Sequence, residues 1–399
     1  MADFSREENL VIKLLSNSIN DKEDTVDFSD IDFQKLFEIS DKNSVNMIVF
    51  DRIKALRSLI DNDLYMKWLY FASRKLTIRE EVLSVQKKLT DILEVGGIDY
   101  FVFKGFCAAE YYNRSELRET GDIDFYVDFN DFDKADKLLK ENGFKLFNSS
   151  DDKHWSYEYG KVVLEMHYGF WEVPNNRCGE FAVDYLKKTL KDRSLYKIDG
   201  YSFYGPNCVS HALILILHIV NHIQRGGIGL RHLYDYASFF VSDAFRENKD
   251  EILSVLNKSG LLEVTKIISK ICNVYFCEKS YDFYCEVNSD LSDKLLSDII
   301  KSGNFGGLSE DSYYGSGIFT INRDENGSFF KSLFSFCKVA WKPCEKNKFL
   351  LIIAPFYIGI RYFFRALTGK RPKINPLKFT KNGFERAELY ESLKLFKES

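Results

Sequence analysis

Residues 122–129 read DIDFYVDF, a stretch with the apolar and aromatic content of a buried β-strand that nevertheless begins with two aspartates. Side chains two residues apart on a strand lie on the same face, so Asp122 and Asp124 would be neighbours. Two carboxylates this close repel and raise each other's pKa unless a cation lies between them. The stretch indicates a metal site on a sheet or an edge strand with both acids in water, and the surrounding apolar residues favour the metal site.

The overall composition indicates a large core without basic character. The chain has 399 residues, of which 45% are hydrophobic and 16% aromatic, enough for two or three domains. Charged residues make up 29%, the formal net charge is -4, and the pI is about 6.0. Nucleic-acid-binding proteins are normally basic, so the sequence gives no strong nucleic-acid signal.

The sequence shows no sign of export or of a membrane span. Its start, MADFSREENL, is charged where a secretory signal would be apolar. The cysteines are scattered without a C-x-x-C pair, as expected for reduced thiols. The most apolar C-terminal run, residues 349–360, is shorter than the roughly 20 residues that a bilayer span needs. We expect a cytoplasmic protein without a transmembrane segment.

Hydrophobic periodicity divides the chain into four regions and predicts an α+β fold. Residues 1–95 have helical spacing that stops at Gly96-Gly97, and residues 96–205 change to strand spacing. Residues 206–300 are helical again, and residues 301–399 combine a Gly/Ser-rich segment, expected to be mobile, with an aromatic and basic segment. We expect a helical N-terminal region, a small mixed-sheet core and a helical C-terminal region.

Two further local predictions concern the ends of elements. Asp131 is expected to cap a helix that ends at Gly143. The apolar run at residues 349–360 is interrupted by Pro355, which favours a buried helix with a break. The lysines and arginines between residues 338 and 373 leave a weak membrane-surface contact as the alternative.

A third carboxylate stands where a metal site would need it. Glu165 lies in the strand-like run KVVLEMHYGF, and if this strand lies beside the one with Asp122 and Asp124, three carboxylates converge. Mg²⁺ is typically held by one or two carboxylates together with phosphate oxygens and waters. Upstream, a strand at residues 98–103 ends at Lys104-Gly105, where the glycine would let a phosphate approach the backbone.

These motifs together resemble a known family. The ordered set is similar to the polymerase-β-type nucleotidyltransferase superfamily, and more closely to the mostly uncharacterised bacterial proteins of the nucleotidyltransferase 5 family. The resemblance covers roughly residues 30 to 370, with its sharp motifs between residues 102 and 168. The motifs are Lys104-Gly105, Arg118 before Asp122-Ile123-Asp124, Gly143-Phe144, and Leu164-Glu165-Met166-His167.

The resemblance implies a role for each motif. Asp122 and Asp124 would bind Mg²⁺ or Mn²⁺, and Glu165 would be a further ligand or the base for an acceptor hydroxyl. Lys104 and Gly105 would contact the nucleotide, although Phe106 stands where the wider superfamily has a serine in this phosphate-binding element.

Arg118 and several other residues carry less specific predictions. Arg118 would contact the nucleotide or, slightly favoured, pair with Asp122. Asp235 would cap a helix N-terminus or pair with Arg231, four residues earlier on one helix. The histidines His218 and His222 have zinc-binding spacing but no evident third ligand, so packed histidines are favoured over a zinc site. The lower-ranked site residues are His167, His218, Arg231 and Asp235.

The leading interpretation is an enzyme that moves a nucleoside monophosphate from an NTP to an acceptor hydroxyl on a small molecule, a sugar-like metabolite or a protein. The alternative is a binding or scaffold protein that keeps the fold without the chemistry, favoured by the missing serine after Gly105 and by the C-terminal segment. A zinc protein built on His218 and His222 is the third.

Overall fold

A computed structural model describes most of the chain through residue 304 and short segments after it. The described residues are 4–24, 26–149, 153–170, 173–225, 227–304, 337, 341, 343–347, 349–367, 386 and 388–397. The Gly/Ser-rich segment that was expected to be mobile lies outside them from residue 305 on.

The N-terminal region is helical, as predicted. Its first helix begins with a capping box in which Ser5 and Glu8 satisfy each other's backbone N–H groups. Its last helix runs for 34 residues and ends at Gly96, followed by Gly97 with a φ of 61°. The helices are α1 (Arg6–Ile19), α2 (Phe33–Lys42), α3 (Asn46–Ile53), η1 (Lys54–Leu59) and α4 (Asn62–Val95).

A five-stranded mixed sheet follows, in the order β1-β2-β5-β4-β3. Only β2 and β5 are parallel, and the other neighbours are antiparallel. The strands are β1 (Tyr100–Phe103), β2 (Asp122–Val127), β3 (Lys145–Asn148), β4 (His154–Tyr159) and β5 (Val162–His167), and the helical segments between them are α5 (Gly105–Ala109), η2 (Ser115–Leu117), η3 (Phe129–Asp131) and α6 (Phe132–Glu141). The predicted mixed sheet and α+β class are confirmed.

Asp131 lies at the predicted N-cap position, directly before α6, but its side chain makes no capping hydrogen bond. Its φ of -96° and ψ of -1° are helix-like, because the chain enters α6 directly from η3, whereas a capping side chain needs an extended backbone. Asp128 instead caps η3 by accepting a hydrogen bond from the N–H of Asn130.

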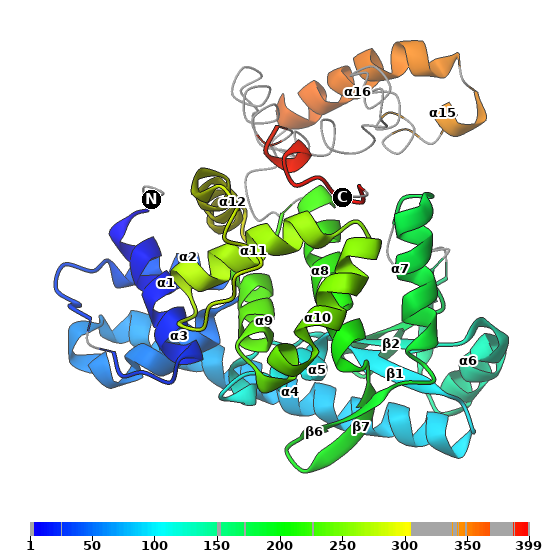
Figure 1. Ribbon diagram of the computed structural model, residues 1–399, viewed down its shortest axis with the longest axis horizontal. Coiled ribbons are helices and arrows are strands. Elements are labelled where there is room, and N and C mark those ends of the chain that lie inside the picture. The colour runs from blue at the N-terminus through cyan, green and yellow to red at the C-terminus, as the bar shows by residue number, and fades with distance from the viewer. Residues whose placement is uncertain are drawn as a thin grey trace.

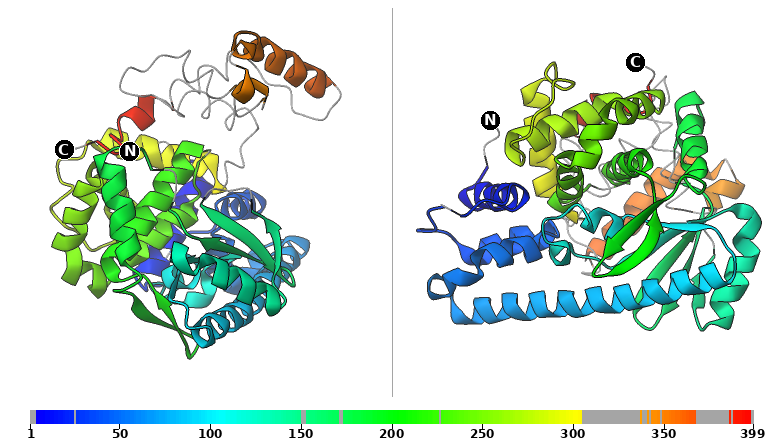
Figure 2. Two further views of the ribbon diagram at one scale, coloured as in Figure 1. Left: turned by 90° about the vertical axis from the view of Figure 1, so that its right-hand side faces the viewer. Right: turned by 60° about the horizontal axis from the view of Figure 1, so that its bottom comes forward.

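The two faces of the sheet contact different helices. Ile123, Phe125 and Leu164 lie in one apolar core with side chains of α4, whereas Phe103 and Tyr126 belong to the core of the following helices. Figure 1 and the right-hand view of Figure 2 show α4 along one side of the molecule and the later helices on the other. Since Asp124 alternates with Ile123 and Phe125, it lies on the face turned toward those later helices.

Two elements were not predicted from the sequence. They are the helix α7 (Arg177–Lys188) and a two-stranded hairpin, β6 (Ser194–Ile198) with β7 (Tyr201–Gly205). The hairpin strands are five residues each and turn at Asp199-Gly200, both with positive φ. This is the favoured geometry of a two-residue hairpin turn.

Helices resume at residue 208, as predicted. The first, α8 (Cys208–Arg225), is buried along most of its length, including Leu213, Ile214 and Ile216. The helices that follow are α9 (Leu230–Phe240), α10 (Asp243–Lys258), α11 (Leu262–Tyr275) and α12 (Ser289–Ser302). The eight cysteines are free thiols, consistent with the expectation from their spacing.

The apolar C-terminal run does not form the expected buried, broken helix. After α15 (Pro343–Lys346), the helix α16 (Leu350–Leu367) continues through Pro355. Several of its apolar side chains are exposed, with Phe356 75% and Phe364 62% accessible, and in Figure 1 it lies with α15 apart from α1 to α12. Within the described residues, no helix is long and apolar enough to cross a bilayer.

Candidate active site

The parallel pairing of β2 with β5 brings the predicted carboxylates together. Asp124 is the register partner of Glu165, and Asp122 is that of Val163. The two strands therefore present Asp122, Asp124 and Glu165 on the same face of the sheet. β2 and β5 are therefore neighbours in one sheet, as the sequence analysis required for the three carboxylates to converge.

Asp124 is the most enclosed of these acids. Its side chain is 3% exposed, and its Oδ1 lies 2.7 Å from Lys104 Nζ and 3.1 Å from His167 Nε2. Burial raises the pKa of Asp124, but the Lys104 ammonium and the His167 ring outweigh burial and hold that pKa well below its usual range. Asp124 is therefore ionised at neutral pH and already has a cation beside it.

Lys104 reaches Asp124 because of the turn that ends β1. Phe103 is the register partner of Asp124, so Lys104, the residue that follows Phe103, begins beside the Asp124 carboxylate. Lys104 has a φ of 59°, which is uncommon for a residue with a side chain. Gly105 has a φ of 26°, and a Cβ placed there would meet nothing within 4 Å, so the space beside this turn is open.

Glu165 and two histidines complete the cluster. His167 Nε2 lies 3.4 Å from Glu165 Oε2, and His154 Nε2 lies 3.9 Å from Glu165 Oε1. Burial lowers the pKa of His167, but its hydrogen bonds to Asp124 and Glu165 outweigh burial and raise it. His167 thus connects the two carboxylates. We call Lys104, Asp122, Asp124, Glu165 and His167 the acidic cluster.

The sequence analysis did not identify His154. It is the register partner of His167 across β4 and β5, and the two rings are stacked with centroids 4.9 Å apart. The ligand atoms of His154, Glu165 and His167 lie within 4.8 Å of one another. The signal would have been the antiparallel register of β4 on β5, which follows from the short turn at Gly160.

Asp122 lies at the exposed start of β2. Protein packed around it, followed by the charge of Asp124, raises the pKa of Asp122. The ammonium of Lys104 lowers the pKa of Asp122, but by less than burial and Asp124 raise it. The acidic cluster therefore holds more negative charge than its own cations balance.

Arg118 and Asp235 pair with each other, and both predicted partners are wrong. Arg118 Nε and Nη2 each donate to one Asp235 oxygen at 2.8 Å, and both side chains are nearly inaccessible. Tyr112 donates a third hydrogen bond to Asp235 at 2.7 Å. Arg231 instead donates to the backbone carbonyl of Glu119. A buried carboxylate needs a bidentate partner, which the planar guanidinium of Arg118 supplies from another segment.

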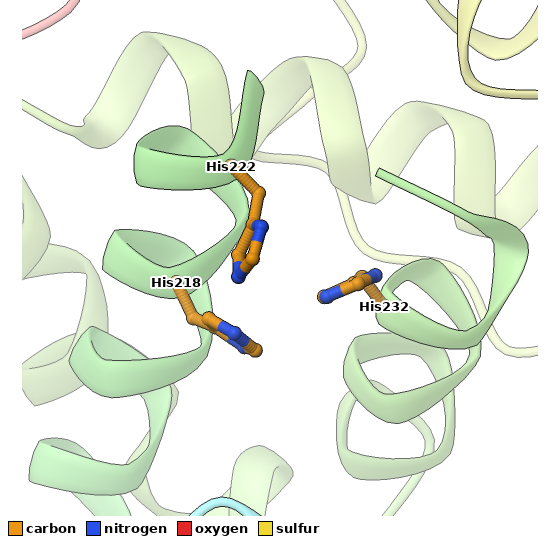
Figure 3. Close-up of side chains that lie close together, drawn as sticks. All are labelled: His218, His222 and His232. Atoms are coloured by element: carbon orange, nitrogen blue, oxygen red, sulfur yellow. The ribbon is translucent and has the colours of Figure 1, made fainter. Parts of the chain in front are cut away.

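A second cluster forms where α8 meets α9. His218 and His222 point from α8 toward His232 on α9, as Figure 3 shows, and the ring centroids lie 4.6, 4.9 and 5.1 Å apart. We call these residues the histidine cluster. The sequence analysis found no evident third ligand for His218 and His222, and the structure places His232 beside them, on the helix that follows the Gly-containing segment at residues 227–229.

The histidine cluster is electrically unlike the acidic one. Burial, then the positive charge of Lys104, lowers the pKa of His218. Burial, then the charge of Arg231, lowers the pKa of His232. Both rings are therefore neutral at pH 7. The influence of Lys104 on His218 also shows that the two clusters are close enough for their charges to interact.

Comparison with known proteins gives one family match. The model of the family described as uncharacterised nucleotidyltransferase matches residues 29–276, which include every residue of both clusters. Among solved structures, an antigenic nucleotidyltransferase-like protein from Paracoccidioides brasiliensis is 17% identical over 46% of this chain and 88% of its own, with a TM-score of 0.26. A tRNA-processing enzyme complex is 13% identical over 77% of this chain and 100% of its own, with a TM-score of 0.22. No curated protein matches the chain.

Proposed function

We propose, since this chain belongs to the family of uncharacterised nucleotidyltransferases, that it transfers a nucleoside monophosphate from an NTP to an acceptor hydroxyl. The acceptor would be a small molecule, a sugar-like metabolite or a protein side chain. The observation that carries the proposal is the arrangement around Asp124, with Lys104 at 2.7 Å and with Glu165 as its register partner on the parallel strand.

The acidic cluster has the donor set that Mg²⁺ prefers. Asp122, Asp124 and Glu165 offer carboxylate oxygens on one face of the sheet. The pKa of Asp122 is raised first by burial and then by the charge of Asp124, and a divalent cation beside the two carboxylates would favour the ionised form of Asp122. These residues would hold Mg²⁺ or Mn²⁺, and the bound ion would stabilise charge on the phosphate oxygens as pyrophosphate leaves.

Lys104 would bind the phosphates of the NTP. Its ammonium is a point charge on a flexible chain, 14% exposed, and it can exchange Asp124 for a phosphate oxygen without leaving the site. The open space at Gly105 gives the phosphate chain room beside the backbone. This role replaces the serine that the superfamily places after the glycine.

Glu165 would accept the proton of the acceptor hydroxyl. Its side chain is 28% exposed, more than that of Asp124 at 3%, so an incoming hydroxyl can reach it. His167 would act as a positioning residue, because its ring contacts both Asp124 and Glu165 and fixes their orientation. Arg118 would hold the segment that leads into β2 through its buried pair with Asp235.

The test is a thermal-shift panel of the four NTPs with and without Mg²⁺ on the wild type, Asp122→Asn and Asp124→Asn. A ligand at about 100 times its Kd adds roughly 2.7 kcal/mol to the free energy of unfolding. We expect one NTP to raise the Tm of the wild type only with Mg²⁺, and neither variant to respond. Release of pyrophosphate from that NTP then serves to screen acceptors.

Glu158→Gln is the matched control, because Glu158 is an exposed carboxylate on β4 of the same sheet, opposite Val163 rather than Glu165. It should respond to NTP and Mg²⁺ like the wild type. If both aspartate variants also respond like the wild type, the acidic cluster is not the nucleotide site and the proposal fails.

One observation favours the alternative of a protein that keeps the fold without the chemistry. The Lys104 ammonium already neutralises the buried carboxylate of Asp124. A protein without a metal at this site would keep this ion pair for stability. On that alternative, no NTP shifts the Tm with or without Mg²⁺, and Lys104→Met destabilises the protein without changing any binding. The same panel therefore separates the two functions.

A further inference from the structure

The three rings of the histidine cluster are arranged as metal ligands. His218 and His222 stand one helical turn apart on α8, and His232 faces them from α9. One ring nitrogen from each lies within 4.8 Å of the other two. Tetrahedral zinc–nitrogen bonds of about 2.0–2.1 Å place nitrogens about 3.3 Å apart, so the rings would have to rotate toward one another to complete the site.

His232 is buried, and besides the two histidines it has the backbone of Gly229 as a polar neighbour. It is 2% exposed, and neither of its ring nitrogens has a hydrogen-bond partner. Buried polar atoms in native proteins are normally satisfied by protein, by water or by an ion. His218 and His222 are half-buried, so the cluster is less enclosed on their side than at His232.

The geometry points to a site for a divalent transition metal, held by His218, His222 and His232, with a fourth position open for a ligand from solution. Imidazole nitrogens suit Zn²⁺, Cu²⁺, Fe²⁺ and Ni²⁺ rather than Mg²⁺. Three histidines with an open position form a known catalytic type of zinc site. This site shares no residue with the acidic cluster and does not depend on nucleotidyl transfer.

The charges around the cluster select the fourth ligand. Arg231 directly precedes His232 on α9, so a positive charge lies close to the cluster. A dication bound to three imidazole nitrogens would be repelled by this charge, and an anionic oxygen in the fourth position offsets the repulsion. We therefore expect hydroxide or a phosphate oxygen there.

The experiment uses Co²⁺ as the probe, because its visible absorption reports tetrahedral imidazole coordination. The full chain is stripped with a chelator, titrated with Co²⁺ and then competed with Zn²⁺. We expect the wild type to bind one Co²⁺ that Zn²⁺ displaces. Loss of a direct ligand, in His232→Ala or His222→Ala, should weaken binding by more than the roughly 10- to 100-fold typical of outer-shell changes.

His211→Ala is the matched control. His211 lies on α8, is fully buried, and has no hydrogen-bond partner on either ring nitrogen, but it is not part of the cluster. It should bind Co²⁺ like the wild type. Because His222 is half-buried, His222→Ala serves as the readout if His232→Ala does not fold.

A second arm separates this site from the metal-capable group formed by His154, Glu165 and His167. Glu165→Gln should leave the Co²⁺ absorption intact. The inference is overturned if the wild type binds no Co²⁺, if folded His232→Ala and His222→Ala bind it as tightly as the wild type, or if Glu165→Gln alone abolishes the absorption.

Discussion

The acidic cluster and the histidine cluster stabilise buried polar groups in opposite ways. In the acidic cluster, charges are paired within the protein: Lys104 and His167 both contact Asp124. In the histidine cluster, the rings are neutral, and both nitrogens of His232 lack a partner. The first cluster pairs its charges within the protein, whereas for the second we infer a ligand from solution.

The buried pair of Arg118 and Asp235 connects these two clusters. Arg118 precedes β2, which carries Asp122 and Asp124, and Asp235 lies one helical turn after His232 on α9. We therefore expect both clusters to depend on this ion pair for their placement. The strongest test is therefore to remove the ion pair between Arg118 and Asp235.

The largest expected effect comes from Arg118→Met. It leaves Asp235 buried without its cation, and we expect a loss of about 3–5 kcal/mol in the free energy of unfolding. Urea unfolding at pH 7 measures it. Arg114→Met is the control, because the pair of Arg114 with Asp51 is half-exposed on the arginine side and should contribute about 1 kcal/mol or less.

The double variant Arg118→Met with Asp235→Leu sharpens this result. Replacing both partners removes the uncompensated charge, so it should be more stable than Arg118→Met alone. Equal stability of Arg118→Met and the wild type would mean that the pair does not hold the two clusters in place.

The next effect tests whether Lys104 serves the substrate or only Asp124. Lys104→Met should weaken NTP binding in the presence of Mg²⁺ by roughly 10- to 100-fold, since a hydrogen bond to a charged group contributes about 1.5–3 kcal/mol. Isothermal titration measures it. Lys161→Met, which removes an exposed lysine at the turn between β4 and β5, should bind as the wild type does. Unchanged affinity in Lys104→Met would assign Lys104 to Asp124 alone.

The difference between the clusters also explains which of them the sequence could reveal. Asp122 and Asp124 are two residues apart on a strand, so their common face follows from local geometry alone. Glu165 required one further assumption, the pairing of β2 with β5, which the structure bears out. His232 and the Arg118–Asp235 pair required knowing how a helix packs on distant segments, which no local period contains.

The same limit explains the C-terminal error. The run around Pro355 is apolar at helical spacing, and the helix α16 was predictable to that extent. Whether its apolar side chains are buried depends on what packs against them, and in the described residues Phe349 and Phe356 are mostly exposed. Apolar content predicts burial only when a partner surface exists.

Lowering the pH should reduce the free energy of unfolding through the histidine cluster. The pKa of His232 is lowered on folding, so the unfolded chain binds a proton more readily and stability is lost as the pH falls below about 6.5. Between pH 7 and pH 5 this amounts to about 2 kcal/mol for one fully buried ring. His232→Gln should reduce the pH dependence of the free energy of unfolding by about that amount, measured by urea unfolding in a chelator.

His167 in the acidic cluster should behave oppositely. Its pKa is raised on folding, so its contribution is fully present below its unfolded pKa and is lost as the pH rises through its folded pKa. His167→Gln should therefore make the loss of stability from pH 7 to pH 5 steeper. If the two variants change the pH dependence in the same direction, the two clusters do not differ in the way described.

The smallest expected effect concerns Asp122 and would separate function from stability within the acidic cluster. The pKa of Asp122 is raised on folding, first by burial and then by the charge of Asp124, so the ionised carboxyl costs the fold stability at pH 7. Without a metal, Asp122→Asn should raise the free energy of unfolding, but by less than about 1 kcal/mol because solvent screens an exposed charge. Differential scanning calorimetry should show a Tm increase of roughly 2 °C or less.

The same variant should lose its response to NTP with Mg²⁺, because a residue kept for binding is retained at a cost to stability. A lower Tm in Asp122→Asn would instead mean that Asp122 stabilises the metal-free fold, and the excess negative charge inferred for this cluster would be wrong.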